Sequence, residues 1–432
     1  MKCIPRTLLL LLCSASLTAC GDPDLDSIGP NSGEGRSTLR AAISRDEATE
    51  LPVEVSEVQR GNINLSLDLL REAGEPGQNQ MISAYSIRSA FAQVYGGAAG
   101  RTALQMEEVL RFGIVGEAFH SSMNAVDQAL NRRTLPATSK QTAVEFHTAN
   151  SVWGRPDLPW MPSYLELLGR YYGSAVETID FRADPEKARQ VINAWVEAQT
   201  AGRIKELLPL KSINISTQSV LTNAVYFKAP WAKEFSTELT RPLPFTTLAG
   251  DIAQVPTMIQ EMTGGFARGD GWFAFEKNFR GHALSMVFIV PDAGTFTDFE
   301  SALNGAKVQE IIDALETTEL SVRLPKFSFE TSTELKTPLV NMGLTELFSN
   351  EADLSGMTRG GGLKVNEAYH KTFVAIDEGG GEAAASTAIV TGFTTSIPDP
   401  VTIAAVDRPF VFAIRDIETG VFLFYGRVVD PS

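Results

Sequence analysis

Cysteine and histidine are scarce in this chain, and their scarcity limits the chemistry that it can perform. Three of its 432 residues are cysteines and four are histidines. The positions are Cys3, Cys13, Cys20, His120, His147, His282 and His370. There is no His-x-x-x-His pair and no cysteine supports the histidines, whereas a zinc site needs such clustered ligands. We therefore expect no metal and no cofactor.

Motifs of common enzymes are missing too. The chain has no Gly-x-Ser-x-Gly elbow for a nucleophilic serine, and no Gly-x-Gly-x-x-Gly follows a predicted strand. A catalytic triad assembled from distant residues leaves no local pattern, but no residue here suggests one. We predict that the protein is not an enzyme and has no catalytic residues.

Positive charge is also in short supply. The chain has 37 lysines and arginines against 52 aspartates and glutamates, a formal net charge of −15. Removal of a predicted N-terminal signal takes away Lys2 and Arg6, so the charge becomes −17 (37 − 2 = 35 against 52). Such an acidic surface argues against nucleic-acid binding. A heparin-type patch is also disfavoured, since Arg132-Arg133 is the only adjacent basic pair in a predicted helix.

Residues 1–19 have the pattern of a targeting segment. Lys2 and Arg6 give a positive start, Leu8–Leu12 is an apolar run too short to span a bilayer, and Leu17-Thr-Ala-Cys20 ends it. This ending resembles a bacterial lipoprotein signal, in which Cys20 becomes the lipidated first residue. An ordinary secretory signal cleaved nearby is the alternative.

Lipid on Cys20 would anchor the protein in a bacterial cell envelope, at the outer membrane or cell surface, unless the chain is secreted. Residues 20–54 are rich in Gly, Ser, Asp and Pro and predict a disordered tether. Residues 55–432 show no further break in composition and no internal repeat, which favours a single domain. Because Cys3 and Cys13 leave with the signal, no internal disulfide is expected.

Apolar periodicity predicts helices first and strands afterwards. Ile82–Tyr95 has helical spacing, Thr102-Ala-Leu-Gln105 predicts a capping box for a helix through Leu110, and Asp184-Pro185 opens a helix that runs to Gly202. The predicted strands are 144–152, 219–227, 284–290, 320–329, 365–376, 410–415 and 421–428. This order predicts an α+β fold with helices around large mixed β-sheets.

The segment 377–388 has the composition of a strand that can enter a sheet. Small residues run from Gly379 to Ser386, and β-formers follow. At period two, one face carries Gly381, Ala383, Ala385, Thr387, Ile389 and Thr391. The charged Glu382 falls on the opposite face, so the segment could slide between two strands without burying a charge.

Two other interpretations of this segment remain open on composition alone. Stretches of Gly, Ala and Ser are often flexible linkers. A phosphate-binding loop is a third option, but Asp377, Glu378 and Glu382 would repel a phosphate. Context favours the insertable strand, because a linker is not normally lodged between a long domain and its last hairpin, Arg408–Pro431.

This segment and the C-terminal hairpin together strongly resemble the serpin family of protease inhibitors. The likeness extends from about residue 55 to the end of the chain. Further matching stretches are Ile192–Val196, Thr200–Ile204, Leu221–Trp231, Leu324–Phe327 and Leu344–Met357. The resemblance implies a serpin fold with an exposed, insertable reactive-centre loop at about residues 378–400.

The resemblance also implies a function, the suicide inhibition of a serine protease by a monomer. The protease cleaves the loop, and the freed hinge enters the sheet as a new strand while the protease is still held as an acyl complex. The implied hinge consists of Glu378, Gly380, Gly381, Glu382, Ala383, Ala384, Ala385 and Ser386. Gly381 stands where the family usually has Thr or Ser, which adds backbone entropy to be lost on ordering.

A second group of residues is implied to control the opening of the sheet. Its members are Ser83, Ser86, Asn223, Trp231 and His370. His370 matches the family's sheet histidine, with Asn223 and Ser86 as its expected neighbours. Ala84 replaces the family's usual proline.

The same resemblance places the reactive bond between Thr394 and Thr395, which suits an elastase-like protease. Cleavage after Phe393 is the alternative and suits a chymotrypsin-like enzyme. The rival function is a serpin-fold binding or carrier protein that does not inhibit. Inhibition is favoured because every inward position before Thr387 is Gly or Ala.

Overall fold

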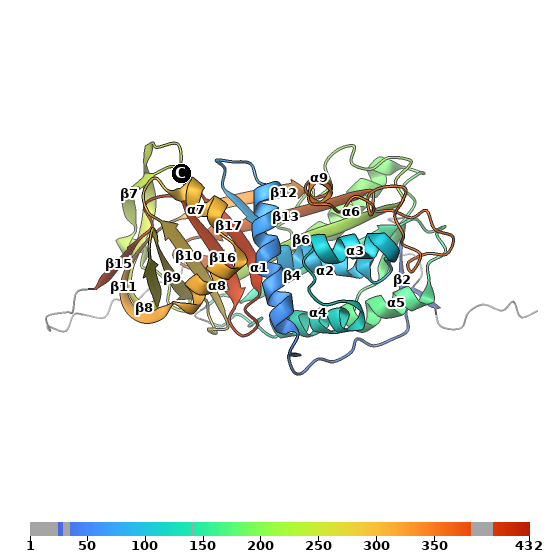
Figure 1. Cartoon of the computed structure of the whole chain (residues 1–432), viewed down its shortest axis with the longest axis horizontal. Coiled ribbons are helices and arrows are strands. Elements are labelled where there is room, and N and C mark those ends of the chain that lie inside the picture. Colours follow the sequence, from blue (N-terminus) through green and yellow to red (C-terminus); the bar gives the residue numbers. More distant parts are fainter. Residues whose placement is uncertain (1–24, 29–34, 140, 382–400) are drawn as a thin grey trace, which may run out of the picture.

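The computed structural model describes residues 25–28, 35–139, 141–381 and 401–432. Over these residues, helices pack against two large β-sheets (Figure 1). The α+β class predicted from the sequence is confirmed. The hinge positions Glu382, Ala383, Ala384, Ala385 and Ser386, the positions Phe393, Thr394 and Thr395, and Cys20 lie outside the described residues.

The start of the predicted hinge lies in an eight-stranded sheet, the main sheet. Its strands in spatial order are β1 (Leu25–Ile28), β2 (Arg36–Ala41), β5 (Val176–Ile179), β4 (Glu145–Gly154), β6 (Ser219–Pro230), β14 (Gly380–Gly381), β13 (Glu367–Ile376) and β12 (Phe327–Glu334). The long strands β6, β13 and β12 run side by side along the molecule (Figure 1).

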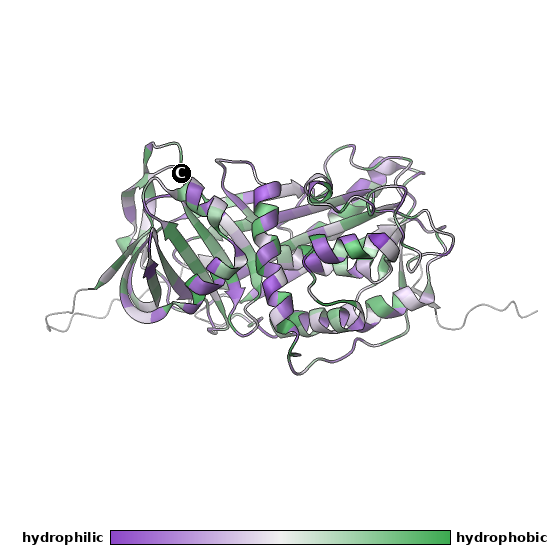
Figure 2. Ribbon diagram, in the orientation of Figure 1, coloured by the Kyte–Doolittle hydropathy of each residue, from purple (hydrophilic) through white to green (hydrophobic). Residues whose placement is uncertain are grey.

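A nine-stranded second sheet carries the C-terminal hairpin. Its order is β15 (Thr402–Ala405), β11 (Glu316–Pro325), β8 (Ile252–Gly269), β9 (Trp272–Asn278), β10 (Leu284–Pro291), β16 (Phe410–Asp416), β17 (Phe422–Val428) and β3 (Gln80–Ile82), with β7 (Arg241–Thr246) paired to β8. Every residue of β10 is buried, and Figure 2 shows this strand as hydrophobic. The second sheet is thus built into the core.

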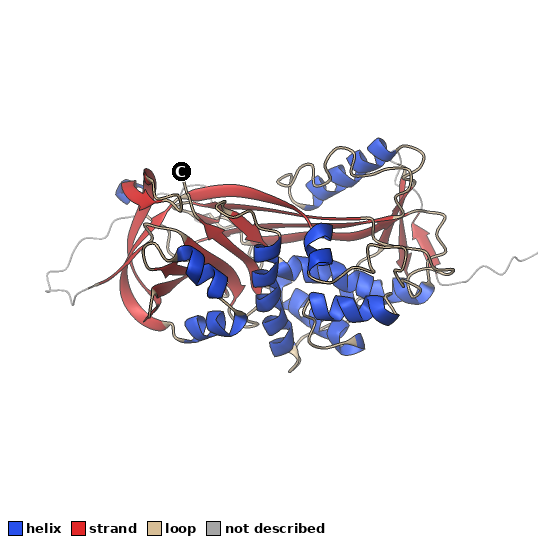
Figure 3. Ribbon diagram, turned by 45° about the horizontal axis from the view of Figure 1, so that its top comes forward, coloured by secondary structure: helices blue, strands red, loops and turns tan. Residues whose placement is uncertain are grey.

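Helices cover both faces of the main sheet (Figure 3). They are α1 (Val55–Glu72), α2 (Ala84–Tyr95), α3 (Gly100–Val109), α4 (Gly116–Asn131), α5 (Pro162–Leu167), α6 (Pro185–Gln199), α7 (Phe296–Ala302), α8 (Gly305–Asp313) and α9 (Lys336–Asn341), with a π-helical turn at Leu168–Tyr172 and a 3-10 turn at Thr237–Leu239. Trp153 and Ala224 pack in one cluster with α6, whereas Val152 and Val225 pack in another with α2. This alternation is the period of two expected of a sheet buried on both faces.

Two sequence predictions of local structure were wrong. Thr102 does not cap α3, which begins at Gly100; its hydroxyl donates to Glu346 and accepts from the backbone N–H of Asp353. The predicted single strand 320–329 is two strands in different sheets, β11 and β12. The chain changes sheet at Lys326, whose N–H donates to Pro256 O of the second sheet.

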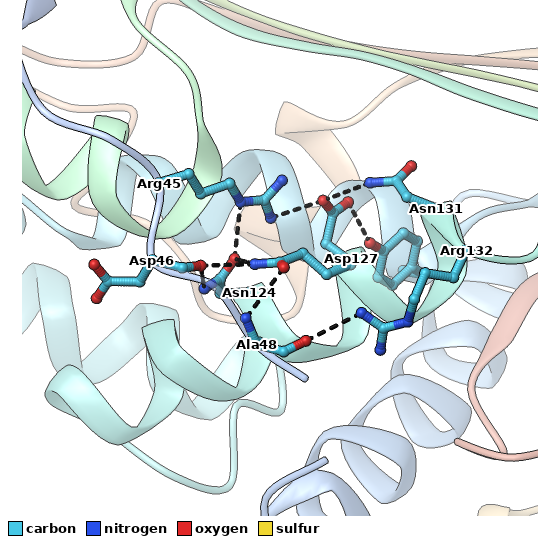
Figure 4. A network of polar contacts seen from close by, with 9 residues as sticks. Arg45, Asp46, Ala48, Asn124, Asp127, Asn131 and Arg132 are labelled. Carbon is cyan, nitrogen blue, oxygen red and sulfur yellow. Dashed lines mark hydrogen bonds and ion pairs between the residues drawn. The ribbon is translucent and has the colours of Figure 1, made fainter. Parts of the chain in front are cut away.

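The predicted tether over residues 20–54 was wrong for the part of it that forms strands. β2 extends the main sheet by antiparallel pairing with β5. Beyond it, Arg45 bonds to Asn124 and Asp127 of α4 at 2.8 Å each, as Figure 4 shows. The backbone of Asp46 accepts hydrogen bonds from Asn124 and Gln128. A polar composition concealed these contacts, because they are made by backbone pairing and ion pairs and not by apolar burial.

Candidate functional site

The start of the predicted loop hinge is already part of the main sheet. Strands β6 and β13 pair directly, in parallel, from Val220↔Glu367 to Val225↔Thr372. Farther along, β14 lies between them and is antiparallel to both, with Gly381 opposite Ala229 on one side and Ile376 on the other. The two long strands are therefore joined over one part of their length and separated by the hinge at the other.

The two glycines of β14 have different requirements. Gly380 has φ +135°, and a Cβ there would lie 2.5 Å from Ala229 O and 2.6 Å from Trp231 N. Only glycine fits this position without strain. At Gly381 the nearest atoms to a Cβ would be Ala229 O at 3.5 Å and the Phe227 ring at 3.6 Å. A small side chain therefore fits at Gly381 and would face the buried Phe227.

Three successive backbone carbonyls at the start of the hinge, those of residues 377–379, accept hydrogen bonds from one short segment that follows β6. Trp231 Nε1 donates to Asp377 O at 3.1 Å, Phe235 N to Glu378 O at 2.9 Å, and Trp231 N to Gly379 O at 2.8 Å. Trp231 was predicted to belong to the sheet-opening region. The structure places it at the hinge, where its ring and its backbone both bind the loop.

The carboxylate of Glu378 fixes the hinge from its other side. Its oxygens accept hydrogen bonds from Lys326 Nζ at 2.7 Å and from Thr240 Oγ1 at 2.8 Å. Burial acts to raise the pKa of Glu378, but these two hydrogen bonds outweigh burial and hold the pKa below its ordinary value. Neither Lys326 nor Thr240 was predicted, because each lies far from the hinge in sequence and comes from the second sheet's connections.

The remaining sheet-opening residues meet where β6 and β13 pair. His370 Nδ1 bonds to Asn223 Oδ1, and Asn223 Nδ2 donates to Ser86 Oγ and to Asn150 Oδ1 at 2.6 Å each. Ser83 takes part through its backbone N–H, which donates to His370 Nε2 at 3.0 Å. Of the two predicted neighbours of His370, Asn223 bonds to it directly, and Ser86 is linked to it through Asn223. Asn150 of β4 was missed, since a lone asparagine in a predicted strand gave no signal of its own.

The hydrogen bonds identify the state of His370. Its Nε2 accepts from a backbone N–H, so the ring is neutral and its Nδ1 carries the proton that is donated to Asn223. Burial lowers the pKa of His370 to about 3. The ring therefore acts as a hydrogen-bonding link between α2, β6 and β13 rather than as a charge.

The described ranges offer little else that could react or bind an ion. They hold no cluster of three or more His, Cys, Asp or Glu side chains placed to bind a metal. None of the helices in these ranges is both long and apolar enough to cross a membrane.

These features define a class of protein in which a very short strand, β14, lies between the ends of two long strands of a central sheet. Comparison with known proteins agrees: residues 60–431 match the family model described as Serpin (serine protease inhibitor). The chain therefore belongs to the serpin family.

Three similar proteins illustrate the match. The leukocyte elastase inhibitor of Bos taurus is 34% identical over 388 residues, which cover 87% of this chain and 100% of that protein. Antithrombin-III of Mus musculus is 35% identical over 367 residues, 84% of this chain and 78% of that protein. The crystal structure of the thermophilic serpin tengpin in its native state superimposes with a TM-score of 0.79 at 26% identity, and covers 90% of this chain and 97% of that one.

The buried neutral His370 predicts a loss of stability in acid. Unfolding returns its pKa from about 3 to its ordinary 6.5, so the unfolded chain binds a proton that the folded one does not. The contribution of His370 is complete above pH 6.5 and decreases toward pH 3, by at most about 1.4 kcal/mol per pH unit. The free energy of unfolding of His370→Gln, measured with denaturant between pH 4.5 and 7.5, should change less steeply with pH than that of the wild type.

A matched control is His147→Gln, because the His147 side chain is 45% exposed. The free energy of unfolding of this variant should change with pH as steeply as that of the wild type. Equal slopes for the wild type and His370→Gln would contradict the assignment of the acid sensitivity to His370.

Proposed function

We propose that this serpin is a suicide inhibitor of an elastase-like or chymotrypsin-like serine protease that acts outside the cell. The observation that carries the proposal is β14, which pairs with both β6 and β13 in the register of an entering strand. A loop that is cleaved by a protease could continue this strand toward the region where β6 and β13 now pair with each other.

The register predicts which contacts such a strand would replace. Continued from Gly381, residue 385 would face Thr372 and Val225, the last pair of the present β6–β13 ladder. Thr387 would face His370 and Asn223. Insertion beyond residue 385 therefore has to break the His370–Asn223 bond, which makes this bond a barrier to insertion in the intact protein.

Insertion would be favourable because a new central strand gains backbone hydrogen bonds on both sides. The space ahead of Gly381 is narrow, with a cavity of about 10 Å³ lined by residues such as Phe227, Phe373 and Ile376. Glycine and alanine at Gly381, Ala383 and Ala385 fit such a space, whereas a charge there would be buried without a partner.

Inhibition then depends on a competition between two rates. Insertion of the strand would drag the acylated protease along the sheet and distort its oxyanion hole, which stops deacylation. If hydrolysis is faster, the protein is cleaved as a substrate. The intact fold is thus a kinetically trapped state, and its function depends on barriers rather than on equilibrium.

Incubation with purified elastase and chymotrypsin tests the proposal directly. We expect a complex of one protease and one inhibitor that survives SDS, and the released fragment to begin at Thr395, or at Thr394 if cleavage follows Phe393. Intact-mass analysis measures the cut. Cleavage without a stable complex would contradict inhibition of these proteases and favour a binding or carrier role.

Substitutions at Gly381 should separate inhibition from loop cleavage. Gly381→Arg should convert the inhibitor into a substrate, because β14 already holds this position in the sheet and a cation beside Phe227 would be buried without a partner and oppose continuation of the strand. The matched control is Gly381→Thr, since the position has room for a small side chain. The stoichiometry of inhibition measures both. An unchanged stoichiometry for Gly381→Arg would exclude the inserted-strand mechanism.

Location is a separate part of the proposal. The N-terminal pattern supports lipidation of Cys20 and anchoring at the outer membrane or cell surface of a bacterium. Each buried methylene of an acyl chain contributes about 0.8 kcal/mol, so the acyl chains of a lipoprotein suffice for stable anchoring. An inhibitor held there would protect the envelope against proteases from outside.

Cys20→Ala should move the protein from the detergent-extracted membrane fraction into the soluble fraction. Its inhibition of a soluble protease should be unchanged, which separates location from function. A soluble wild type with an unmodified N-terminus near Cys20 would exclude the lipid anchor and leave the inhibitor proposal standing.

A further inference from the structure

A buried lysine lies directly behind the segment that holds the hinge. Lys277 of β9 is 2% exposed. Its Nζ donates to Lys233 O at 2.9 Å and to Gln260 Oε1 at 2.6 Å, and lies 3.9 Å from Met262 Sδ. The two oxygens can accept hydrogen bonds from the two N–H groups of a neutral amine as well as from an ammonium group.

Two aromatic rings complete the surroundings of Lys277. Its Nζ lies 5.3 Å from the centroid of the Trp231 ring and 4.6 Å from that of Phe235. The Trp231 ring is in turn stacked on Phe279, with centroids 4.6 Å apart. Trp231 and Phe235 therefore lie beside the amine, together with the two oxygens that accept its hydrogen bonds.

Those two residues are the ones that hold the hinge. Their backbone N–H groups donate to Gly379 O and Glu378 O, and Trp231 Nε1 donates to Asp377 O. Lys277 does not touch the hinge itself. Trp231 and Phe235 therefore connect Lys277 with the hinge.

The charged groups around Lys277 do not neutralise it. Among the described residues, no carboxylate forms an ion pair with its amine. The acidic side chains near it have other partners: Glu276 binds Arg415 and Ser285, Glu378 binds Lys326, and Asp377 accepts from the N–H groups of Gly379 and Gly380. Glu261 and Glu234 contribute backbone oxygens, to Lys233 and Gln260 respectively.

Burial and the nearby positive charge of Lys233 lower the pKa of Lys277 from 10.5 to about 7. Near neutral pH its amine therefore exists in both protonation states. The geometry offers hydrogen bonds to the ammonium form, but burial withholds the water that this charge needs.

We propose that Lys277 is a positioning residue for the loop hinge, and that protonation of its amine favours release of the hinge from Trp231 and Phe235. Release would open the aromatic layer and admit water to the amine. The inference deepens the proposed function, since the hinge is the part of the loop that inserts. Its test uses hinge opening alone and needs no protease, so either proposal can fail without the other.

The direction of the pH dependence of hinge opening follows from the difference in proton affinity between the closed and open states. With the hinge closed the pKa of Lys277 is about 7, and with water admitted it returns toward 10.5. The open state therefore binds the proton more tightly, and opening is favoured as pH falls from about 10 to 7, by up to about tenfold per pH unit. Below about pH 7 both states are charged, and the dependence levels off.

Hydrogen–deuterium exchange of the intact protein measures this opening. The amides of Trp231 and Phe235 donate to the hinge, so peptides that cover residues 229–236 report its release. Protection factors, corrected for intrinsic exchange at each pH, should fall severalfold in the wild type from pH 9.5 to pH 7.5. Lys277→Met, which fills a similar volume without a charge, should show no such fall.

Lys233→Met is the matched control, because it removes a neighbouring lysine and leaves the Lys233 carbonyl that accepts from Lys277. The protection factors of Lys233→Met should still fall as the pH is lowered, and the midpoint of this fall should move to higher pH. If Lys277→Met does not fold, Lys277→Gln replaces it. Wild-type protection factors that do not change with pH would overturn the proposal. A pH dependence that persists in the Lys277 variant would overturn it as well.

Discussion

The structure depends on the parallel pairing of β6 with β13. This ladder joins strands that lie far apart in sequence, and helices cover both faces of the sheet. Its hydrogen bonds hold the sheet closed over six residue pairs, from Val220↔Glu367 to Val225↔Thr372. If another strand entered between them, each would exchange its present partner for the new strand, and the new strand would gain hydrogen bonds on both of its sides. The closed sheet is therefore stable against opening but is not the arrangement with the most backbone hydrogen bonds.

Two sets of contacts oppose the entry of that strand, and they differ in kind. The His370 group crosses the ladder with neutral hydrogen bonds, which a buried site can satisfy without charge. The hinge group uses backbone carbonyls, an ion pair and two aromatic residues at the rim of the sheet. The two groups are separate, because the stretch of β6 between Val225 and Ala229 lies between them.

Much of this arrangement could be predicted from the sequence. The strand-like runs and the ordered matches to a known family identified the fold class and Asn223 as a partner of His370. The insertable segment, most of which lies outside the described residues, stays a prediction. Local patterns were less reliable where tertiary contacts overrode them. Thr102 bonds to Glu346 instead of capping its helix, and the strand predicted over 320–329 divides between two sheets.

The sequence by itself was enough to predict which segment could become a strand, because small uncharged residues at period two are a local property of the chain. Only the tertiary structure decided how that segment is held at rest. Trp231, Lys326 and Lys277 lie far from Glu378 in the chain, and no pattern within any one of their segments records that they meet. Burial decided the rest: it makes His370 a neutral link and lowers the pKa of Lys277, and burial is a property of the packed fold.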